Sequence, residues 1–305
     1  MHYSVLLNES IEGLNIKEDG IYVDCTLGYG GHSSEILKRI PSGHLYAFDQ
    51  DQEAIDYSQK RLSEISSNFT IVHSNFENMK EKLNEIGVEE VDGIIFDLGF
   101  SSPQVDDASR GFSFMKDAPL DMRMDKSSTK TANDVVNKYK EDDLTRIFYE
   151  YGEEKFSRNI AKNIVNLRPI NTTMELVKVI EKSVPKAYFI KHHPERQIFQ
   201  AIRIEVNNEL SVLKSVLPDA ISMLKLKGRL AVITFHSLED RIVKQTFKSL
   251  SEIPKVFQGL RIDDIPKEYR PKIELINRKV IEATEQELSE NSRSKSAKLR
   301  IIERV

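Results

Sequence analysis

Short apolar, β-branched runs alternate with amphipathic segments over the first hundred residues, and this alternation restricts the fold more than any other feature. The strand-like runs are residues 21–26, 44–48, 69–73 and 91–98, and the helix-like segments between them are residues 32–40, 53–65 and 79–86. Strands that are joined by helices pair in parallel, because a helix is long enough to carry the chain back across the sheet. The sequence therefore predicts an α/β fold with a doubly wound parallel sheet.

The alternation stops after Asp97 and returns a hundred residues later. Between these points the spacing of apolar residues predicts helices at 132–139, 142–151, 153–167, 173–183 and 195–217. A strand at 229–235, a helix at 238–250, an irregular loop at 251–271 and late strands at 272–276 and 298–302 follow. We expect one domain from residues 1–105 and 208–305, interrupted by a helical insertion at 106–207.

Composition narrows the class of protein. With 39% apolar and 30% charged side chains in 305 residues, the chain is typical of globular proteins. It has neither an apolar run of membrane-spanning length nor the basic start of a secretory signal. The single cysteine, Cys25, rules out an internal disulfide and fits a reducing compartment. We therefore expect a cytoplasmic protein with no membrane segment.

The net charge of −4 is unevenly distributed. Residues 1–105 hold 7 basic and 18 acidic side chains, a balance of −11, whereas residues 106–305 hold 37 and 30, a balance of +7. Only the local field attracts a polyanion, so the second part remains compatible with a nucleic-acid partner. A solvated charged surface is the competing interpretation.

A glycine-rich loop follows the first predicted strand and opens the first predicted helix. Gly28, Gly30 and Gly31 allow a sharp turn and a close approach of a ligand to the amides at the helix start. Asp49 ends the second strand, 21 residues beyond Gly28, where a carboxylate typically accepts the hydroxyls of a ribose. Together they indicate an adenosine-containing cofactor, with a structural turn as the alternative.

Two further acids favour a cationic cofactor. Asp24 and Asp97 end strands that should meet at one edge of the sheet, close to the loop. Carboxylates there would oppose a pyrophosphate but suit the sulfonium and ammonium of S-adenosylmethionine. Ser33 occupies the third glycine position of the dinucleotide fingerprint. We expect S-adenosylmethionine, and an NAD-linked oxidoreductase remains the alternative.

The segment from Asp97 to Gln104 has a composition suited to methyl transfer. A stiff, polar loop at the carboxyl edge of the sheet can hold an acceptor amine in line with a methyl group. Ser101 and Ser102 are candidates to accept hydrogen bonds from an exocyclic amine, whose lone pair is otherwise delocalised into its ring. A capped turn without catalytic function is the alternative.

Several basic side chains are candidates for RNA contact. Arg110 and Arg123 lie among aromatic residues, a mixture that suits stacking on unpaired bases but also occurs in packed loops with one ion pair. His236 follows the fifth strand, and Lys298 and Arg300 belong to a basic tail that can meet phosphates or solvent. The histidines show no zinc-like spacing, so no metal site is expected.

Long, compositionally unusual motifs recur in one known family. The chain resembles the bacterial 16S ribosomal RNA cytosine-N4 methyltransferases over nearly its whole length. The motifs that carry the resemblance are His2 with residues 4–9, and residues 24–32, 97–104, 110–114, 120–125, 151–154, 199–210, 235–241 and 296–300.

The resemblance implies a Rossmann-like, class I methyltransferase sheet with an inserted helical domain for substrate recognition. It implies binding of S-adenosylmethionine by seven residues: Gly30, Gly31, His32, Asp49, Phe76, Asp97 and Gln104. The implied substrate is the N4 amine of a cytidine in the decoding region of 16S rRNA, free or in the small ribosomal subunit. Methylation of DNA, a non-catalytic RNA-binding role and assembly as a homodimer stay open.

Overall fold

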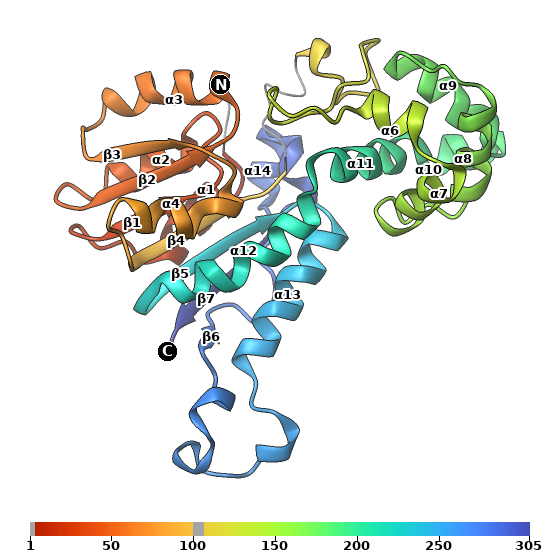
Figure 1. Ribbon diagram of the computed structural model, residues 1–305. Helices are drawn as coiled ribbons and strands as arrows, with labels where there is room; N and C mark the ends of the chain where they lie inside the picture. The colour runs from red at the N-terminus through yellow and green to blue at the C-terminus, as the bar shows by residue number, and fades with distance from the viewer. Residues whose placement is uncertain (1–3, 100–106) are drawn as a thin grey trace. The chain divides into compact units, whose positions relative to one another are not determined.

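The computed structural model describes residues 4–99 and 107–305, and Figure 1 shows it as a ribbon. The chain forms two compact units. One consists of Met1–Gly99 with Leu210–Val305, and the other of Phe100–Glu209. These divisions lie a few residues from those expected from the loss and return of the strand–helix alternation.

The first unit is built on a 7-stranded sheet with the order β3-β2-β1-β4-β5-β7-β6. Neighbours among β1 to β5 pair in parallel, and β7 is antiparallel to both β5 and β6. This is the class I methyltransferase arrangement, so the predicted fold class is confirmed. The strands are β1 Ile21–Asp24, β2 His44–Asp49, β3 Phe69–His73, β4 Val91–Asp97, β5 Leu224–Thr234, β6 Ile273–Leu275 and β7 Lys298–Arg304.

Helices cover both faces of this sheet (Figure 1). Alternate residues of β4 show why: Ile94 and Phe96 belong to one apolar core, whereas Ile95 belongs to the core on the other face. The helices are α1 Leu7–Leu14, α2 Gly31–Leu37, α3 Gln52–Ser63, α4 Met79–Glu85, α12 Glu209–Met223, α13 Ser237–Ser251 and α14 Glu285–Glu290. The sequence did not predict α1 or α14.

The second unit is helical and has its own apolar core. Its helices are α6 Ala132–Lys138, α7 Glu141–Glu150, α8 Ser157–Asn166, α9 Thr173–Ser183, α10 Lys186–His192 and α11 Pro194–Asn207. Thr172 and Glu175 form a capping box at the start of α9, because each side chain accepts a backbone N–H of the other residue.

The structure corrects the prediction of one helix over 195–217. The helix ends at Asn207, since Asn208 adopts a left-handed conformation with φ 54°, and α12 then begins at Glu209. Asparagine tolerates this conformation better than most residues. Arg203 donates two hydrogen bonds of 2.9 Å to the Glu209 carboxylate across the break.

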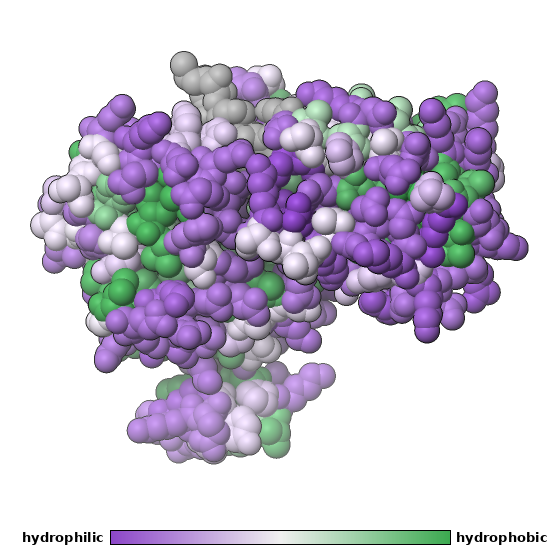
Figure 2. Space-filling model, turned by 45° about the horizontal axis from the view of Figure 1, so that its top comes forward, coloured by the Kyte–Doolittle hydropathy of each residue, from purple (hydrophilic) through white to green (hydrophobic). Residues whose placement is uncertain are grey.

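The surface is mostly hydrophilic on the face that Figure 2 presents, and its apolar residues lie in small separate patches. Among the helices of the described residues, none combines the length and the apolar character that a membrane crossing requires.

Candidate functional site

Three acidic residues end three neighbouring strands of the first unit. Asp24 is the last residue of β1, Asp49 of β2 and Asp97 of β4. Because β1 lies between β2 and β4 and all three run in parallel, these ends meet at one edge of the sheet. The expectation that Asp24 and Asp97 share an edge is confirmed.

The loop after β1 has the backbone that its glycines predict. Gly28 and Gly30 have φ values of 50° and 71°, in the left-handed region that most side chains disfavour. A Cβ on Gly30 would lie 3.1 Å from Ser58 Oγ, and one on Gly31 would overlap Ser4 Oγ. The loop therefore passes closely between two other segments, and its amides at the start of α2 are not shielded by side chains of its own.

Asp49 is fixed by the loop that it faces. The Gly28 N–H donates to Oδ2 across 2.8 Å, and the Asp51 N–H donates to Oδ1 across 2.9 Å. Burial raises the pKa of this carboxyl to about 6, against the lowering effect of these two hydrogen bonds. Each carboxylate oxygen retains a further lone pair with which it can accept a ribose hydroxyl.

Asp24 is held by Thr26 and Ser33, and the sequence did not assign this role to either residue. Thr26 donates its backbone N–H to Oδ1 across 3.0 Å, and Ser33 donates its hydroxyl to Oδ2 across 2.7 Å. The Thr26 hydroxyl also accepts the backbone N–H of Asp97 at 2.7 Å, which joins the ends of β1 and β4. Ser33 thus orients an acid of the site, and this role was not apparent from its place in the glycine fingerprint.

His32 lies beside Asp97, and its ring is buried, whereas the Asp97 side chain is partly exposed. His32 Nε2 lies 3.1 Å from the Val5 carbonyl, and Nδ1 lies 3.6 Å from Asp97 Oδ2. Desolvation lowers the pKa of His32, so the ring is neutral at pH 7 and donates Nε2–H to Val5.

Asp97 combines an unsatisfied oxygen with a raised pKa. Its Oδ1 is buried and has no hydrogen-bond partner among residues 4–99 and 107–305. Desolvation first, then the charges of Asp24, Glu239 and Glu287, raise the pKa of the Asp97 carboxyl well above its usual value. A buried acceptor surrounded by other carboxylates is suited to a cationic or hydrogen-bond-donating ligand.

The N-terminal residues 4–6 pass over the glycine loop, and we call them the N-terminal strap. Val5 accepts the hydrogen bond from His32, and the Leu6 N–H donates to Glu287 Oε1 across 2.9 Å. Leu6 itself has a φ of 49°. Glu287 lies on α14, near the other end of the chain, and no short-range pattern in the sequence indicates this pairing.

Phe76 begins a short 3₁₀ turn directly after β3. Its half-buried ring packs edge-on against Phe96, with ring centroids 5.4 Å apart. The position beyond the end of a strand fits the expected apolar wall for an adenine ring, and that assignment stays a prediction. Three further predicted site residues, Ser101, Ser102 and Gln104, lie outside the described residues.

The candidate RNA contacts of the second unit differ from one another. Arg110 is only 4% exposed, and its Nη2 donates to the carbonyls of Arg123 and Met124 at 2.9 and 3.1 Å. The guanidinium is thus buried and supports the backbone at residues 123–124, as in a packed loop, and an RNA contact by Arg110 stays a prediction. Arg123 is partly exposed and forms an ion pair of 2.7 Å with Asp121.

Three candidate RNA contacts lie in the first unit. His236 caps the start of α13, and its Nε2 lies 3.2 Å from Oε1 of Glu239. Arg300 on β7 forms a two-pronged ion pair with Asp240, with N–O distances of 2.8 and 3.1 Å. In the antiparallel pairing of β5 with β7, the backbone of Lys298 lies opposite that of Thr234, the last residue of β5. Lys298 is therefore at the same edge as the three acids, since Thr234 ends a strand parallel to β4.

The arrangement fits S-adenosylmethionine better than a dinucleotide. Asp49 presents a carboxylate to a ribose beside the bare glycine backbone. Asp24 and Asp97 add negative charge where a dinucleotide would place its pyrophosphate, whereas the ammonium and sulfonium groups of S-adenosylmethionine are positive. The unsatisfied Oδ1 of Asp97 can accept a hydrogen bond from one donor of such a ligand.

Comparison with known proteins gives a match over the full chain. The model of the MraW methylase family matches residues 1–305. Proteins named ribosomal RNA small subunit methyltransferase H are similar to this chain over its entire length. The one from Exiguobacterium sibiricum is 53% identical over 308 residues, covering 100% of this chain and 98% of its own. Those from Lactiplantibacillus plantarum and Clostridioides difficile are 52% and 54% identical, with 100% of this chain and 97% and 99% of theirs covered.

Proposed function

The chain belongs to the MraW methylase family, and on that premise we propose that it methylates small-subunit ribosomal RNA with S-adenosylmethionine as the methyl donor. The observation that carries this proposal is the full-length similarity to three proteins named ribosomal RNA small subunit methyltransferase H. The three strand-end acids supply the matching chemistry at the site. The acceptor that we propose is the N4 amine of a cytidine in the decoding region of 16S rRNA.

The cofactor is assigned to the glycine loop and the acids around it. Asp49 accepts the ribose hydroxyls, Gly30 and Gly31 provide a surface without side chains, and Phe76 contacts the adenine ring. Asp97 accepts from the ammonium group, and His32 fixes the N-terminal strap above the loop. Gln104 completes the set by family resemblance. When bound, the cofactor supplies an electrophilic methyl group on sulfur.

Methyl transfer to an amine needs placement more than a strong base. The nitrogen becomes tetrahedral and positively charged in the transition state, so acceptors aimed at its N–H groups stabilise it. We assign this role to Ser101 and Ser102, with Asp97 at the head of the same segment providing negative charge.

RNA recognition is assigned to the helical unit and to the basic side chains at the carboxyl edge. Arg123, Lys298 and His236 remain candidates, and Arg300, which is paired with Asp240 through Nε and Nη2, retains its Nη1 donors for a phosphate. We place the activity in the cytoplasm. Assembly as a homodimer remains a prediction that sedimentation at working concentration tests.

The direct test uses labelled S-adenosylmethionine with small ribosomal subunits and, separately, with free 16S rRNA from cells that lack this protein. Mass mapping should then find a single methylated cytidine in one of the two substrates. Label in neither substrate, with native folding shown by circular dichroism, would reject the proposal. Protection from thermal unfolding by NAD and not by S-adenosylmethionine would favour an oxidoreductase instead.

A further inference from the structure

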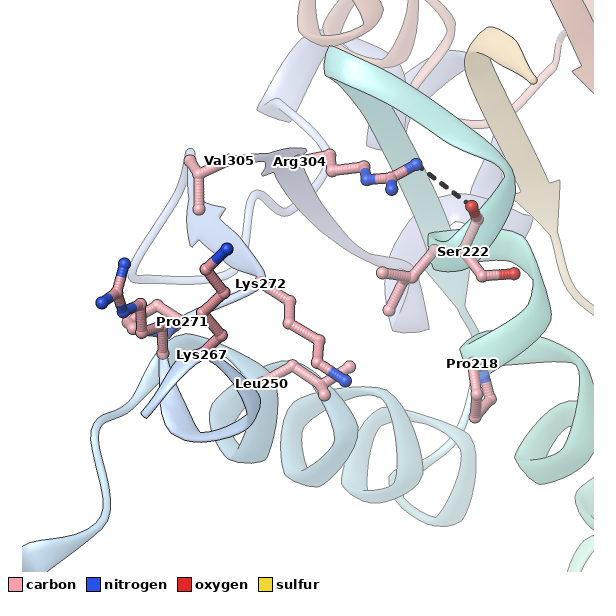
Figure 3. A pocket seen from close by; sticks show the side chains of 10 residues that line it. Pro218, Ser222, Leu250, Lys267, Pro271, Lys272, Arg304 and Val305 are labelled. Atoms are coloured by element: carbon pink, nitrogen blue, oxygen red, sulfur yellow. Dashed lines mark hydrogen bonds between the residues drawn. The ribbon is translucent and has the colours of Figure 1, made fainter. Parts of the chain in front are cut away.

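A second concave site lies in the first unit, away from the three acids. It has a volume of about 480 Å³ and is lined by the last turns of α12 and α13, the end of β7 and residues 267–272. Figure 3 shows residues 267–272 on one side of this pocket and Pro218 and Ser222 of α12 on the other. No part of the site described above contributes to it.

Strand pairing puts this pocket at the opposite edge of the sheet from Asp97. Arg304 ends β7, which runs antiparallel to β5, and its Nη1 donates to the carbonyls of Ser222, at 3.1 Å, and of Leu224. Leu224 is the first residue of β5, so Arg304 lies at the amino edge. A ligand here is separated from the cofactor by the length of the strands.

The lining is basic. Four of its ten side chains are cationic, Lys267, Arg270, Lys272 and Arg304, and none of the ten is acidic. Glu90, outside the lining, pairs with Arg304 at 3.5 Å and offsets part of the charge. A concave surface with this excess of positive charge attracts anions.

Two of the cations are held in place before any ligand arrives. Arg270 donates Nε–H to the Ile265 carbonyl across 2.8 Å and Nη2–H to the Asp263 carbonyl across 3.0 Å. The carbonyl contacts of Arg304 fix its guanidinium in the same manner. Because a guanidinium has five N–H donors, each arginine retains donors for an anion at little further entropic cost.

The other two cations are lysines with no ion-pair partner among the described residues. Lys267 and Lys272 are exposed, whereas Lys17 and Lys225 of the same unit are both paired with Asp92. An exposed ammonium that is left unpaired beside two fixed guanidiniums can neutralise a phosphate without losing an existing contact.

The remaining lining is apolar and can pack against the C–H face of a sugar. It consists of Pro218, Ile221, Leu250, Pro271 and Val305, with Ser222 the one neutral polar side chain. Cations around an apolar floor match a phosphate that carries a ribose better than they match a bare inorganic ion, which would leave the floor unused.

We propose that this pocket binds a backbone phosphate and adjacent ribose of small-subunit ribosomal RNA, as a contact remote from the methylated nucleotide. The inference rests on the proposed function, because the substrate there is a large polyanion able to reach two edges of the sheet. Phosphate contacts of this kind set position and affinity and carry no sequence information. A free nucleotide offers the same chemistry, and the experiment separates the two sources.

The test compares the double variant Lys267→Glu/Lys272→Glu with the control Lys60→Glu/Lys244→Glu, which reverses two exposed lysines outside the pocket. Binding to small subunits and to 16S rRNA is measured over a salt series. We expect the pocket variant to bind at least about tenfold more weakly than the control at low salt, with a salt slope lowered by about 1.5. S-adenosylmethionine affinity, measured by calorimetry, stays unchanged in both variants.

Each outcome decides the matter. Equal RNA affinity and salt slope in the two double variants overturn the inference, as does loss of cofactor affinity in the pocket variant alone. A pocket variant that loses thermal protection by adenosine monophosphate while keeping its RNA affinity overturns it in favour of a free nucleotide. Because binding is measured without methyl transfer, failure of the proposed reaction shows separately, as absence of label with the unmodified protein.

Discussion

The backbone N–H of Gly28 donates to Oδ2 of Asp49 across 2.8 Å, so that the loop after β1 and the end of β2 hold one another in place. The contact orients the carboxylate before a cofactor arrives. It also fixes the loop in the left-handed conformation that Gly28 adopts, with φ 50°. Preorganisation of this type lowers the entropic cost of binding.

Replacing Asp49 by alanine should remove most of the cofactor affinity. Two charge-assisted hydrogen bonds to ribose contribute about 3 kcal/mol together, which corresponds to about a hundredfold change in Kd. Calorimetric titration with S-adenosylmethionine measures this change in Kd. The control Asp56→Ala removes an exposed acid of α3 that contacts Gln52, and it should bind normally. An Asp49→Ala protein with the affinity of the control would reject the ribose assignment.

Cofactor binding should weaken as the pH falls through about 6. The raised pKa of Asp49 means that the free protein takes up a proton there, and the neutral carboxyl accepts hydrogen bonds less well than the carboxylate. The contribution of Asp49 to the affinity is therefore constant above this range and declines by up to about tenfold per pH unit below it. Asp49→Asn should bind weakly at every pH and lack this part of the profile, which a titration series from pH 5 to 8 reveals.

Asp97→Asn should stabilise the fold while weakening cofactor binding. Because the folded-state pKa of Asp97 is raised, its contribution to stability is present at low pH and is lost as the pH rises above the usual aspartate range. The neutral variant avoids this loss, so its melting temperature should exceed that of the parent at pH 7 and approach it near pH 4.

Asp92, on the same strand, is the matched control for that comparison. Burial opposes its ionisation, but hydrogen bonds from Lys225, the Ile21 amide and Lys17 lower the pKa of its carboxyl overall. Asp92→Asn should therefore lower the free energy of unfolding by about 1–3 kcal/mol at pH 7. Urea titrations measure the change in the free energy of unfolding for both asparagine variants. Changes of the same sign would contradict the electrostatic account of the site.

Replacing Gly30 or Gly31 by alanine should lower the stability of the fold, for a different physical reason at each position. At Gly30 the backbone is left-handed, so the cost of about 1–2 kcal/mol persists whatever the neighbours are. At Gly31 the new methyl group meets the Ser4 side chain, and the added substitution Ser4→Gly should restore stability and cofactor affinity. Urea unfolding of both alanine variants, each with and without Ser4→Gly, tests this; rescue at Gly30 as well would count against it.

Glu287→Ala should release the N-terminal strap. The Leu6 N–H loses a charged acceptor, which costs about 1.5–3 kcal/mol, and its hydrogen exchange should become faster. Glu287→Gln keeps an acceptor oxygen and should retain most of the protection. Glu290→Ala removes an exposed acid on the same helix that accepts a hydrogen bond from Gln286, and it is the control. Unchanged exchange at Leu6 in Glu287→Ala would show that this contact does not hold the strap.

Sequence periodicity was sufficient for β1 to β4 because these strands are short, mostly apolar and bounded by turn residues. The positions of Asp24, Asp49 and Asp97 followed from that, since the carboxyl ends of parallel strands share an edge. The break at Asn208 was missed because apolar spacing continues through it, and only the backbone shows the left-handed turn. Hydropathy likewise does not show that Arg110 is buried, because its partners are backbone carbonyls.

Contacts between distant segments were also beyond the sequence. Glu287 and Leu6 are 281 residues apart, and one hydrogen bond among many acids and amides leaves no pattern. The hydroxyls of Thr26 and Ser33 are in the motif itself, yet their role in holding Asp24 depends on the exact turn of the loop. Functional side chains are usually oriented by neighbouring hydrogen-bond donors, and a search for such donors beside Asp24 would have indicated Thr26 and Ser33.

The hydrogen bond between Glu287 and Leu6 also sets the order in which parts of the site form during synthesis. The glycine loop and its three acids are made within the first hundred residues, but the residue that secures the strap over the loop is among the last twenty. A nascent chain can therefore form β1 to β4 long before its cofactor loop is closed. The contact that holds the strap forms only after α14 has been made, and a chain cut short before α14 would carry every predicted cofactor ligand and still lack this contact.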